Sequence, residues 1–353
     1  MATSLANQNV SENRSPQSDP VQLLLQMTTG YVVSASLWIA AELKVADHLQ
    51  SGPKRVTDLA RATGVTEDGL YRVLRVLAMA GVFSETEHRT FALTQPAELL
   101  CSHHPQSQRD TVVWLADPFH YGVIADLMHS VKTGQPAVER VTGKPVFDFF
   151  ASDEVENKRF HNAMTNLSAS FLPALFEAYD FSQFSTVVDV AGGHGYMICE
   201  ILRRYPQTRG ILFDLHPVAE GAEHRICEMA LQSRCRTVGG DFFKSIPEGG
   251  DAYLMKMIIH DWDDERALSI LKNCHRALQQ KPHGKLLLLE LVLPPGDQYS
   301  ASKLIDIEML LMTGGRERTA QEFRDLLAKA GFRLTQIVPT KSPYCVVEAE
   351  LAD

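Results

Sequence analysis

The glycine-rich turn Ala191–Gly195 constrains the fold more than any other stretch of this chain. It follows a mostly β-branched apolar run, Val187–Val190, and precedes a helical pattern. Such a run predicts a buried parallel strand, and glycines let the backbone approach a ligand where a Cβ atom would clash. A second apolar run, Gly210–Asp214, ends in a carboxylate that is placed to accept hydrogen bonds from ribose hydroxyls. Together the two runs predict a nucleoside-containing cofactor above the carboxyl ends of adjacent strands.

Strands and helices alternate through the last half of the chain, which predicts an α/β fold with a parallel sheet and crossover helices. The expected strands are Thr186–Val190, Gly210–Asp214, Arg236–Gly239, Ala252–Ile259 and Lys285–Leu293. A helix over Ala320–Ala330 follows, with Thr319 and Glu322 as a capping box. The closing runs Arg333–Val338 and Tyr344–Ala349 predict an antiparallel hairpin at the sheet edge.

The composition is that of a globular protein with two domains. The chain has 353 residues, of which 45% are hydrophobic, and a net charge of -9; this length is too great for one compact core. Lys and Arg are scattered, so no nucleic-acid partner is expected. Six dispersed cysteines without a CxxC motif are typical of reduced thiols in a cytoplasmic protein. Residues 1–19 are polar and Pro-containing, lack a signal-peptide layout, and are expected to form a disordered tail.

An apolar segment follows this tail. Helical spacing from Val21 to Leu49 predicts one helix that is apolar on most sides and must be covered by more than one neighbour. We expect part of that cover to come from a second subunit. The stretch Tyr31–Ala46 is interrupted by Glu42 and Lys44 and is too short to span a bilayer, so no membrane partner is expected.

Two short helices and a hairpin come next, which is the pattern of a winged-helix domain. Their expected boundaries are Thr57 and Gly64 for the first helix, Thr66 and Gly81 for the second, and Val82–Ser84 with Thr90–Leu93 for the hairpin. Such domains often bind DNA, so a transcription regulator is an alternative. However, the second helix offers only Arg72 and Arg75, while Glu85 and Glu87 in the wing would repel phosphate. A packing role is therefore favoured.

Asp241 and Phe242 follow two glycines at the end of the third expected strand. The carboxylate can accept a hydrogen bond from an adenine amino group while the ring packs on the base; alternatively, Asp241 is a turn residue. The nicotinamide fingerprint G-x-G-x-x-G/A is met only in part, because Ile198 stands at its sixth position. A dehydrogenase is therefore a less favoured alternative.

His260 ends the fourth expected strand, beside the predicted crevice, and is well placed as a general base; the alternative is a helix-cap or packing histidine. Asp263, Asp264 and Glu265 favour a helix N-terminus and need no catalytic role. Lys256 lies inside the strand, where a buried charge is costly without a partner, so we expect its side chain to snorkel or to pair near the cofactor. Acids beside the histidine imitate a magnesium site, but no metal is required.

Six motifs in this order resemble those of the S-adenosylmethionine-dependent small-molecule O-methyltransferases. They are Asp-Val-Ala-Gly-Gly-His-Gly, Phe-Asp-Leu, Gly-Asp-Phe-Phe, Met-Lys-x-x-x-His-Asp-Trp-x-Asp, Glu-x-x-Leu-Pro and Gly-Gly-Arg-Glu-Arg-Thr-x-x-Glu-Phe. That family includes plant caffeic acid, vertebrate hydroxyindole and bacterial polyketide and phenazine enzymes. The resemblance covers nearly the whole chain past the tail. It implies a Rossmann-like class I methyltransferase sheet and an N-terminal winged-helix domain that mediates homodimerisation.

The resemblance also implies a set of residues that bind S-adenosyl-L-methionine. The glycine loop would hold the methionine part, one acid the ribose, and an acid with an aromatic ring the adenine. In that order they are Gly192 and Gly193, then Asp214, then Asp241 and Phe242, with Asp189 and Lys256 completing the site. Ala191 departs from the family pattern, in which many relatives have a third glycine. Alanine removes one freely rotating backbone position.

The matching catalytic residues are His260 as general base and Glu290 and Glu317 as the acids that flank it. A phenol is a weak nucleophile until its proton leaves, and the histidine would take that proton as the methyl group moves. A carboxylate on the other ring nitrogen would fix the tautomer. Both acids are candidates, with Glu317 favoured by its fuller motif match; otherwise they are a strand-end acid and a partner for Arg316 or Arg318.

Family segments that line the acceptor cavity contain Phe160, Met164, Met309, Met312 and Asp261. An apolar pocket of this kind suits a flat aromatic or polyketide-like acceptor, although some of these residues would be ordinary core. The expected domains are 20–105 for dimerisation, 106–180 for a helical pocket segment and 181–353 for catalysis. N- or C-methyl transfer, or cofactor-dependent hydroxylation, are alternatives on the same fold.

Overall fold

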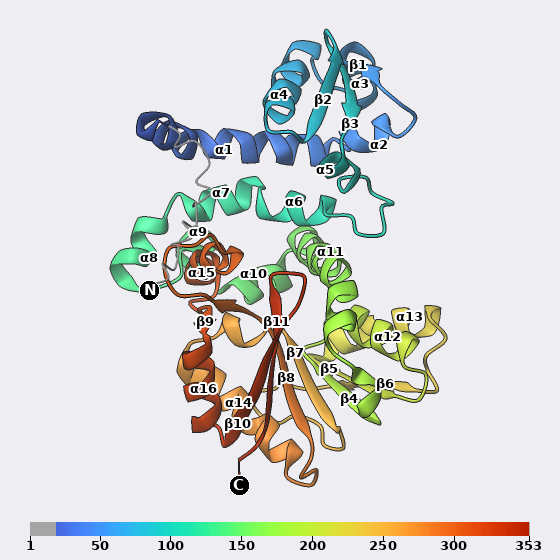
Figure 1. Ribbon diagram of the computed structural model, residues 1–353, viewed down its shortest axis with the longest axis vertical. Helices are drawn as coiled ribbons and strands as arrows, with labels where there is room; N and C mark the ends of the chain where they lie inside the picture. Colours follow the sequence, from blue (N-terminus) through green and yellow to red (C-terminus); the bar gives the residue numbers. More distant parts are fainter. Residues whose placement is uncertain (1–18, 353) are drawn as a thin grey trace, which may run out of the picture. The chain divides into compact units, whose positions relative to one another are not determined.

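The computed structural model describes residues 19–352 of the chain. The chain separates into two compact units, one that ends at Pro96 and one that begins at Ala97. Figure 1 labels the helices and strands of each unit. Most of the expected disordered tail, residues 1–18, lies outside the described residues, while Asp19 accepts a hydrogen bond from the Val21 backbone N–H and caps the first helix.

The first unit has the predicted winged-helix arrangement. Its elements are α1 (Pro20–Glu42), α2 (Val45–Leu49), β1 (Lys54–Arg55), α3 (Val56–Thr63), α4 (Glu67–Met79), β2 (Phe83–Glu87) and β3 (Thr90–Leu93), and α5 (Gln95–Glu98) crosses the boundary. The strands form a three-stranded sheet in the order β1-β3-β2. Gly64 ends α3 in the left-handed region and Thr66 is the N-cap of α4, as expected. Thr57 is not a cap, because α3 begins at Val56 with Arg55 as its N-cap.

The N-terminal helix differs from the prediction in two ways. Lys44 takes a left-handed conformation with φ 52°, which divides the expected single helix into α1 and α2. Helix α1 has 23 residues and is long and apolar enough to cross a membrane by length and composition alone. The length argument made for Tyr31–Ala46 therefore does not extend to α1, which begins earlier in the chain. Much of it is also exposed within one chain, with Leu24 66% and Met27 72% exposed.

The second unit contains one large mixed sheet in the order β10-β11-β8-β7-β4-β5-β6 (Figure 1). Its strands are β4 (Thr186–Val190), β5 (Arg209–Asp214), β6 (Cys235–Gly239), β7 (Ala252–Lys256), β8 (Lys285–Leu293), β10 (Phe332–Pro339) and β11 (Tyr344–Leu351), and the short β9 (Arg318–Thr319) pairs with β8. Strands β4 to β8 are parallel, and β10 and β11 form the predicted antiparallel hairpin. The strand order reverses between β4 and β7, which is where open α/β sheets bind ligands.

Strand β7 is shorter than predicted. It ends at Lys256 because Met257 takes a left-handed conformation with φ 55°. The chain then forms the 3-10 turn η2 (Ile259–Asp261). The apolar run Met257–Ile259 therefore belongs to a turn at the end of the strand, where a bulky residue in this conformation is strained.

The second unit contains a set of helices, some of which cover the two faces of the sheet. They are α6 (Arg109–Leu115), α7 (Pro118–Ile124), α8 (Leu127–Thr133), α9 (Ala137–Thr142), α10 (Val146–Ser152), α11 (Glu154–Ala178), η1 (Phe181–Gln183), α12 (Tyr196–Arg204), α13 (His216–Glu228), α14 (Asp264–Leu278), α15 (Ala301–Met312) and α16 (Ala320–Lys329). Val187 packs with residues of α11, α12 and α13, whereas the next residue, Val188, packs with α14 and α16 on the other face. This alternation is the period of two expected of a strand. The predicted capping box of Thr319 and Glu322 is present in α16.

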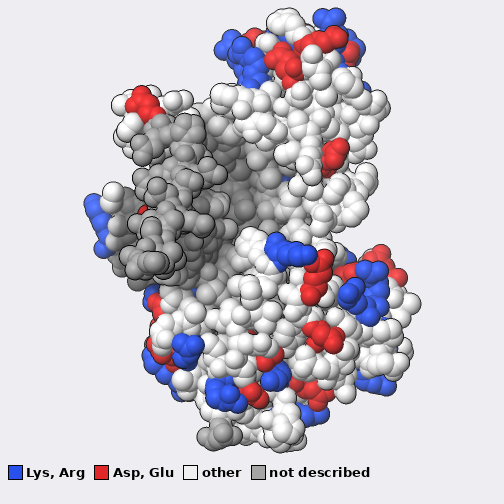
Figure 2. Space-filling model, in the orientation of Figure 1, with Lys and Arg blue, Asp and Glu red and all other residues white. Residues whose placement is uncertain are grey.

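Charged side chains of both signs are mixed on the drawn face of the second unit (Figure 2). On the face drawn in Figure 2, Lys and Arg lie among Asp and Glu over this unit. Mixed charge of this kind does not form the broad basic surface that nucleic-acid binding uses.

Candidate active site

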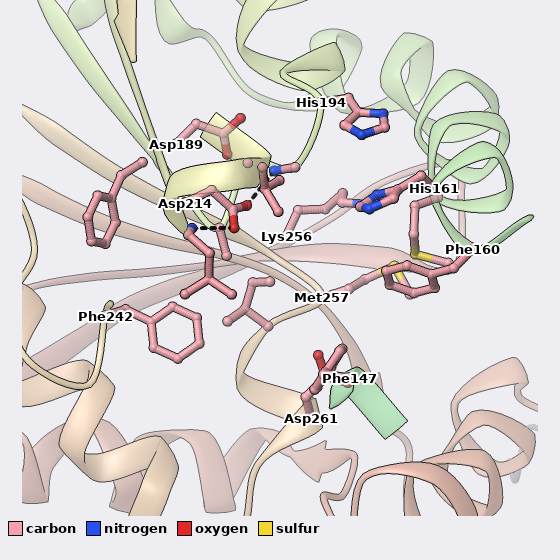
Figure 3. A pocket seen from close by; sticks show the side chains of 18 of the residues that line it. Phe147, Phe160, His161, Asp189, His194, Asp214, Phe242, Lys256, Met257 and Asp261 are labelled. Atoms are coloured by element: carbon pink, nitrogen blue, oxygen red, sulfur yellow. Dashed lines mark hydrogen bonds between the residues drawn. The ribbon is translucent and has the colours of Figure 1, made fainter. Parts of the chain in front are cut away.

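A cavity of about 480 Å³ opens above the carboxyl ends of β4, β5, β6 and β7. The residues predicted to bind the cofactor all line it: Asp189, Gly192, Gly193, Asp214, Asp241, Phe242 and Lys256. Figure 3 shows several of them around the cavity. Three acids from three successive strand ends therefore converge, as their spacing in the sequence predicted.

The glycine loop after β4 is held by the acid at the end of β5. Asp214 Oδ2 accepts the Gly193 backbone N–H at 2.8 Å, and its Oδ1 accepts the Leu215 N–H at 2.7 Å. A Cβ atom on Gly192 would lie 2.7 Å from the Asp189 carboxylate, and Gly193 has φ +57°. Ala191 has φ 56°, a conformation in which alanine is strained and glycine is not. The departure from the family pattern thus falls where a glycine would suit the backbone.

Asp189 and Lys256 are the charged groups at the floor of the cavity. Burial raises the pKa of Asp189 and lowers the pKa of Lys256, and the charge of each partly offsets the effect on the other. Among the described residues, the buried Asp189 Oδ2 has no hydrogen-bond partner. A buried polar atom without a partner is costly, so this oxygen fits a site that a polar ligand completes.

The opposite side of the cavity is aromatic. It is lined by Phe147, Phe150, Phe160, Met164 and Trp262. Phe160 and Met164 are therefore in the cavity as predicted, and Asp261 lines it as well. Met309 and Met312 are buried on α15 and are not among the lining residues; Met312 belongs to the core around Trp114 and Phe150.

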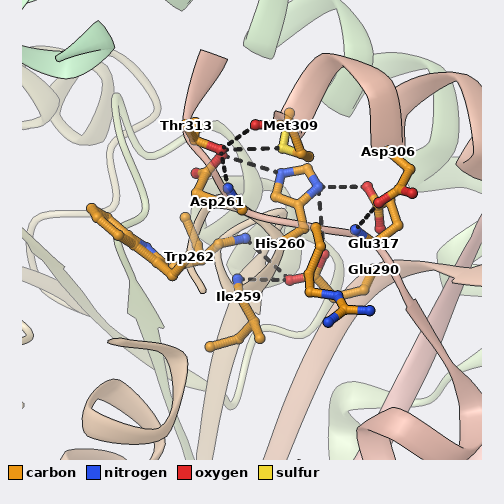
Figure 4. A network of polar contacts seen from close by, with 12 residues as sticks. Ile259, His260, Asp261, Trp262, Glu290, Asp306, Met309, Thr313 and Glu317 are labelled. Carbon is orange, nitrogen blue, oxygen red and sulfur yellow. Dashed lines mark hydrogen bonds and ion pairs between the residues drawn. The ribbon is translucent and has the colours of Figure 1, made fainter. Parts of the chain in front are cut away.

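His260 lies in η2 and is only 3% exposed. Its Nδ1 is 2.7 Å from Glu317 Oε1 and 3.9 Å from Glu290 Oε2, and its Nε2 is 3.6 Å from Asp261 Oδ1 (Figure 4). His260 itself does not line the cavity, whereas Asp261 does. The Nε2 atom therefore lies on the side of Asp261, a residue that lines the cavity, and Nδ1 lies on the side of the two glutamates.

The two glutamates hold different parts of this turn. Glu317 bonds to the imidazole ring, while Glu290 Oε1 accepts the backbone N–H groups of Ile258 at 3.2 Å and Ile259 at 2.9 Å. Burial raises the pKa of both acids, and for Glu317 the charge of Asp306 raises it further. One acid thus sets the ring orientation and the other sets the backbone that carries the ring.

A second set of contacts holds the histidine turn from outside, and its residues were not predicted as site residues. Arg318 is 1% exposed and donates to the carbonyls of Ile259 and Trp262, both at 2.9 Å. The Arg316 backbone N–H donates to the His260 carbonyl at 2.8 Å. A Cβ atom on Gly315 would overlap that same carbonyl oxygen. The motif Gly-Gly-Arg-Glu-Arg-Thr contains the residues that make these contacts. The contacts join segments more than fifty residues apart, so the motif alone did not identify their partners.

Comparison with known proteins agrees with this geometry. Residues 124–333 match the O-methyltransferase domain, and residues 25–103 match the O-methyltransferase dimerisation domain. Phenazine O-methyltransferase of Lysobacter antibioticus is 42% identical over 96% of this chain and 99% of its own length. The 8-amino-8-demethylriboflavin N,N-dimethyltransferase of Streptomyces davaonensis is 32% identical over 94% of this chain and 96% of its own.

A solved structure supports the same class. Human N-acetylserotonin methyltransferase, in complex with S-adenosylmethionine, superposes with a TM-score of 0.87 at 26% identity and covers 96% of this chain and 100% of its own. The chain therefore belongs to the family of S-adenosylmethionine-dependent O-methyltransferases. Its cofactor is S-adenosylmethionine.

Proposed function

We propose that the protein methylates a hydroxyl group on a flat aromatic metabolite, with His260 as the general base. The observation that carries the proposal is the orientation of His260: its Nδ1 is bonded to Glu317, and its Nε2 lies 3.6 Å from Asp261, a residue that lines the cavity. With Nδ1–H donating to Glu317, Nε2 is free of a proton and can accept one from a hydroxyl in the cavity. Glu317 then stabilises the imidazolium that forms.

The cofactor residues are proposed from the same cavity. Gly192, Gly193 and Asp189 would hold the amino-acid end, Asp214 the ribose, and Asp241 with Phe242 the adenine. When bound, S-adenosylmethionine supplies an electrophilic methyl group. Lys256 would balance the buried charge of Asp189, since each shifts the pKa of the other toward the charged form.

The acceptor side favours a planar molecule. Phe150 stacks on Phe160 with ring centroids 5.0 Å apart, and Trp262 lies on the same cavity. Aromatic walls with few polar groups are typical of pockets for flat apolar ligands, and the phenazine enzyme of Lysobacter antibioticus acts on such a ring system by its name. We infer a phenazine- or polyketide-like acceptor. Phe160 and Met164 would contact it, while Met309 and Met312 would support the wall from behind.

A screen of acceptors tests this function. Purified protein would be mixed with methyl-labelled S-adenosylmethionine and separate sets of phenolic, hydroxyphenazine, aromatic amine and indolic compounds, and the products analysed by mass spectrometry. Label in the hydroxyl sets alone supports the proposal. Label confined to amines would favour N-transfer, which is the second candidate because a relative with 32% identity is a dimethyltransferase of an amino group.

Asp214→Ala should weaken S-adenosylhomocysteine binding about 10- to 100-fold, the usual worth of a hydrogen bond to a charged group. The variant also frees the Gly193 and Leu215 N–H groups that Asp214 now holds. Isothermal titration would measure Kd, with Asp297→Ala, on an exposed loop, as the control. An unchanged Kd for Asp214→Ala would remove the ribose assignment.

We propose that the protein is a cytoplasmic homodimer that needs neither membrane nor nucleic acid. The exposed apolar side of α1, including Leu24, Leu25 and Met27, lies in or beside the matched dimerisation region. Covering such a face with a second copy removes it from water. Sedimentation of the intact protein in detergent-free buffer should show a dimer, and Leu24→Asp with Met27→Asp should shift it toward monomer. A stable monomer of the unmodified protein at micromolar concentration would contradict this role of α1.

A further inference from the structure

A second buried histidine lies outside the site described so far. His120, on α7, is 3% exposed. Its Nδ1 is 2.9 Å from Asp117 Oδ1, and its Nε2 is 3.3 Å from Glu308 Oε1 on α15. Each ring nitrogen thus faces a carboxylate, which is the arrangement that a doubly protonated imidazole needs.

The groups around this ring have a negative balance. Asp117 and Glu308 contact the imidazole directly, and from α11 Arg159 lies 3.7 Å from Asp117 and 2.9 Å from Glu156. Burial alone lowers the pKa of His120, but the contacts with Asp117 and Glu308 outweigh it and raise the pKa to about 9. When the ring is protonated, its contact with Glu308 is an ion pair that links α7 to α15 in the interior.

Helix α15 also contacts Glu317, the acid that is bonded to the proposed base His260. Asp306 Oδ1 accepts the backbone N–H of Glu317 at 2.8 Å. Asp306 and Glu308 are two positions apart on a helix, so they point to opposite sides of it. One side of α15 is therefore fixed by His120, and the other side fixes the Glu317 segment.

Helix α15 packs against β8, α7, α8 and α9 and leaves part of its surface exposed. Leu304 is 61% and Ile307 is 40% exposed, whereas Met309, Leu311 and Met312 are buried. The pair of Glu308 with His120 adds a polar contact between α15 and α7 to this packing.

His120 also supports the acceptor side of the cavity. Its ring meets Trp114 edge-on at 4.8 Å, and Trp114 meets Phe160 edge-on at 5.5 Å. Phe160 lines the cavity. One imidazole therefore lies behind both the aromatic wall and the helix that positions Glu317.

We propose that His120 is a positioning residue for methyl transfer, which sets α15 and the Trp114–Phe160 wall so that the acceptor, Glu317 and His260 are aligned. This inference rests on the proposed role of His260. A misplacement of about 1 Å at a reacting centre costs about a hundredfold in rate. The loss of His120 should therefore act on the chemical step and acceptor binding, and not on the cofactor.

The test compares His120→Gln with the unmodified enzyme at 20 °C, with His224→Gln as the matched control because His224 is 80% exposed on α13. We expect kcat/KM for the acceptor to fall about 10- to 100-fold, while the Kd for S-adenosylhomocysteine changes less than twofold. Glu308→Gln should give a smaller loss, and the double variant should be no worse than His120→Gln alone. A lower Tm with unchanged kcat/KM would mean a structural role only and would overturn the proposal.

Two further measurements keep the outcomes separate. NMR of protein with 15N-labelled histidine should show both His120 nitrogens protonated at pH 8, and a neutral ring would overturn the ion-pair argument. Because the pKa is raised on folding, the stabilisation from His120 is full below its unfolded pKa and is lost as pH rises through about 9. The Tm of the unmodified protein should accordingly fall more between pH 7 and 10 than that of His120→Gln.

The activities of two variants distinguish failure of this inference from failure of the proposed function. Full activity of His260→Ala would contradict the role of His260 as the base. An inactive His260→Ala together with a fully active His120→Gln would contradict only the positioning role of His120.

Discussion

Replacing His260 with alanine should lower kcat for methyl transfer by about two to four orders of magnitude, the usual worth of a general base. The Kd for S-adenosylhomocysteine should stay the same, because the proposed cofactor residues lie on the loop after β4 and the ends of β5, β6 and β7. Stopped assays with a saturating acceptor would give kcat, and isothermal titration would give Kd.

The variant should keep its turn in place. The groups that hold this turn bind its backbone: Arg318 contacts the carbonyls of Ile259 and Trp262, and Glu290 accepts the N–H of Ile259. Loss of the imidazole therefore removes the base without releasing the chain that carried it. His224→Ala, on the exposed side of α13, is the control. Turnover of His260→Ala within a factor of about three of the unmodified enzyme, well below the worth of a general base, would remove His260 from the base role.

Glu317→Gln should lower kcat by a similar amount, about two to four orders of magnitude. A glutamine amide can donate to Nδ1, and this places the proton on Nε2, where it blocks proton acceptance. Glu290→Gln is the matched comparison, since its amide oxygen can still accept the N–H groups of Ile258 and Ile259. We expect that variant to lose less than about tenfold, the effect of weakening a hydrogen bond to a charged group.

Glu317→Gln should also stabilise the folded protein at alkaline pH. Burial raises the pKa of Glu317 in the folded chain, so holding this acid as the carboxylate that orients His260 costs the folded state free energy relative to the unfolded chain. The stability it contributes is full below the ordinary pKa of the acid and is lost as pH rises through the raised value. Glu317→Gln, which cannot ionise, should have the higher Tm at pH 8 and show no advantage near pH 4. An equal loss of activity in both glutamine variants, or a lower Tm at pH 8, would contradict the separate roles of the two acids.

Much of the catalytic unit could be predicted because its signals are local. The apolar runs of β4 and β5 specify strands, and the glycines after β4 specify a turn. The acids at the strand ends are adjacent to these runs in sequence and specify carboxylates that face a ligand. Asp189, Asp214 and Asp241 are therefore in one cavity as expected. The hairpin of β10 and β11 was equally clear from its alternating apolar runs.

Other features depend on contacts that no local pattern reveals. The end of β7 depends on the left-handed Met257, although the apolar run continues to Ile259. The buried Arg318 and the His120 pair join segments far apart in the chain, so their sequence neighbours give no hint of the partner. Whether Met309 lines the cavity or only borders it is decided by the rotation of α15, which helical spacing alone does not fix.

The most direct measurement uses S-adenosylmethionine labelled with 13C in its methyl group, a hydroxylated polycyclic acceptor found in the screen, and NMR of the product. Transfer by the enzyme with His260 and Glu317 intact should give a labelled methyl carbon correlated with a ring carbon through oxygen, and His260→Ala should give almost none. A methyl group on nitrogen or carbon, an oxygenated product without label, or equal yields from both enzymes would contradict hydroxyl methylation by this histidine.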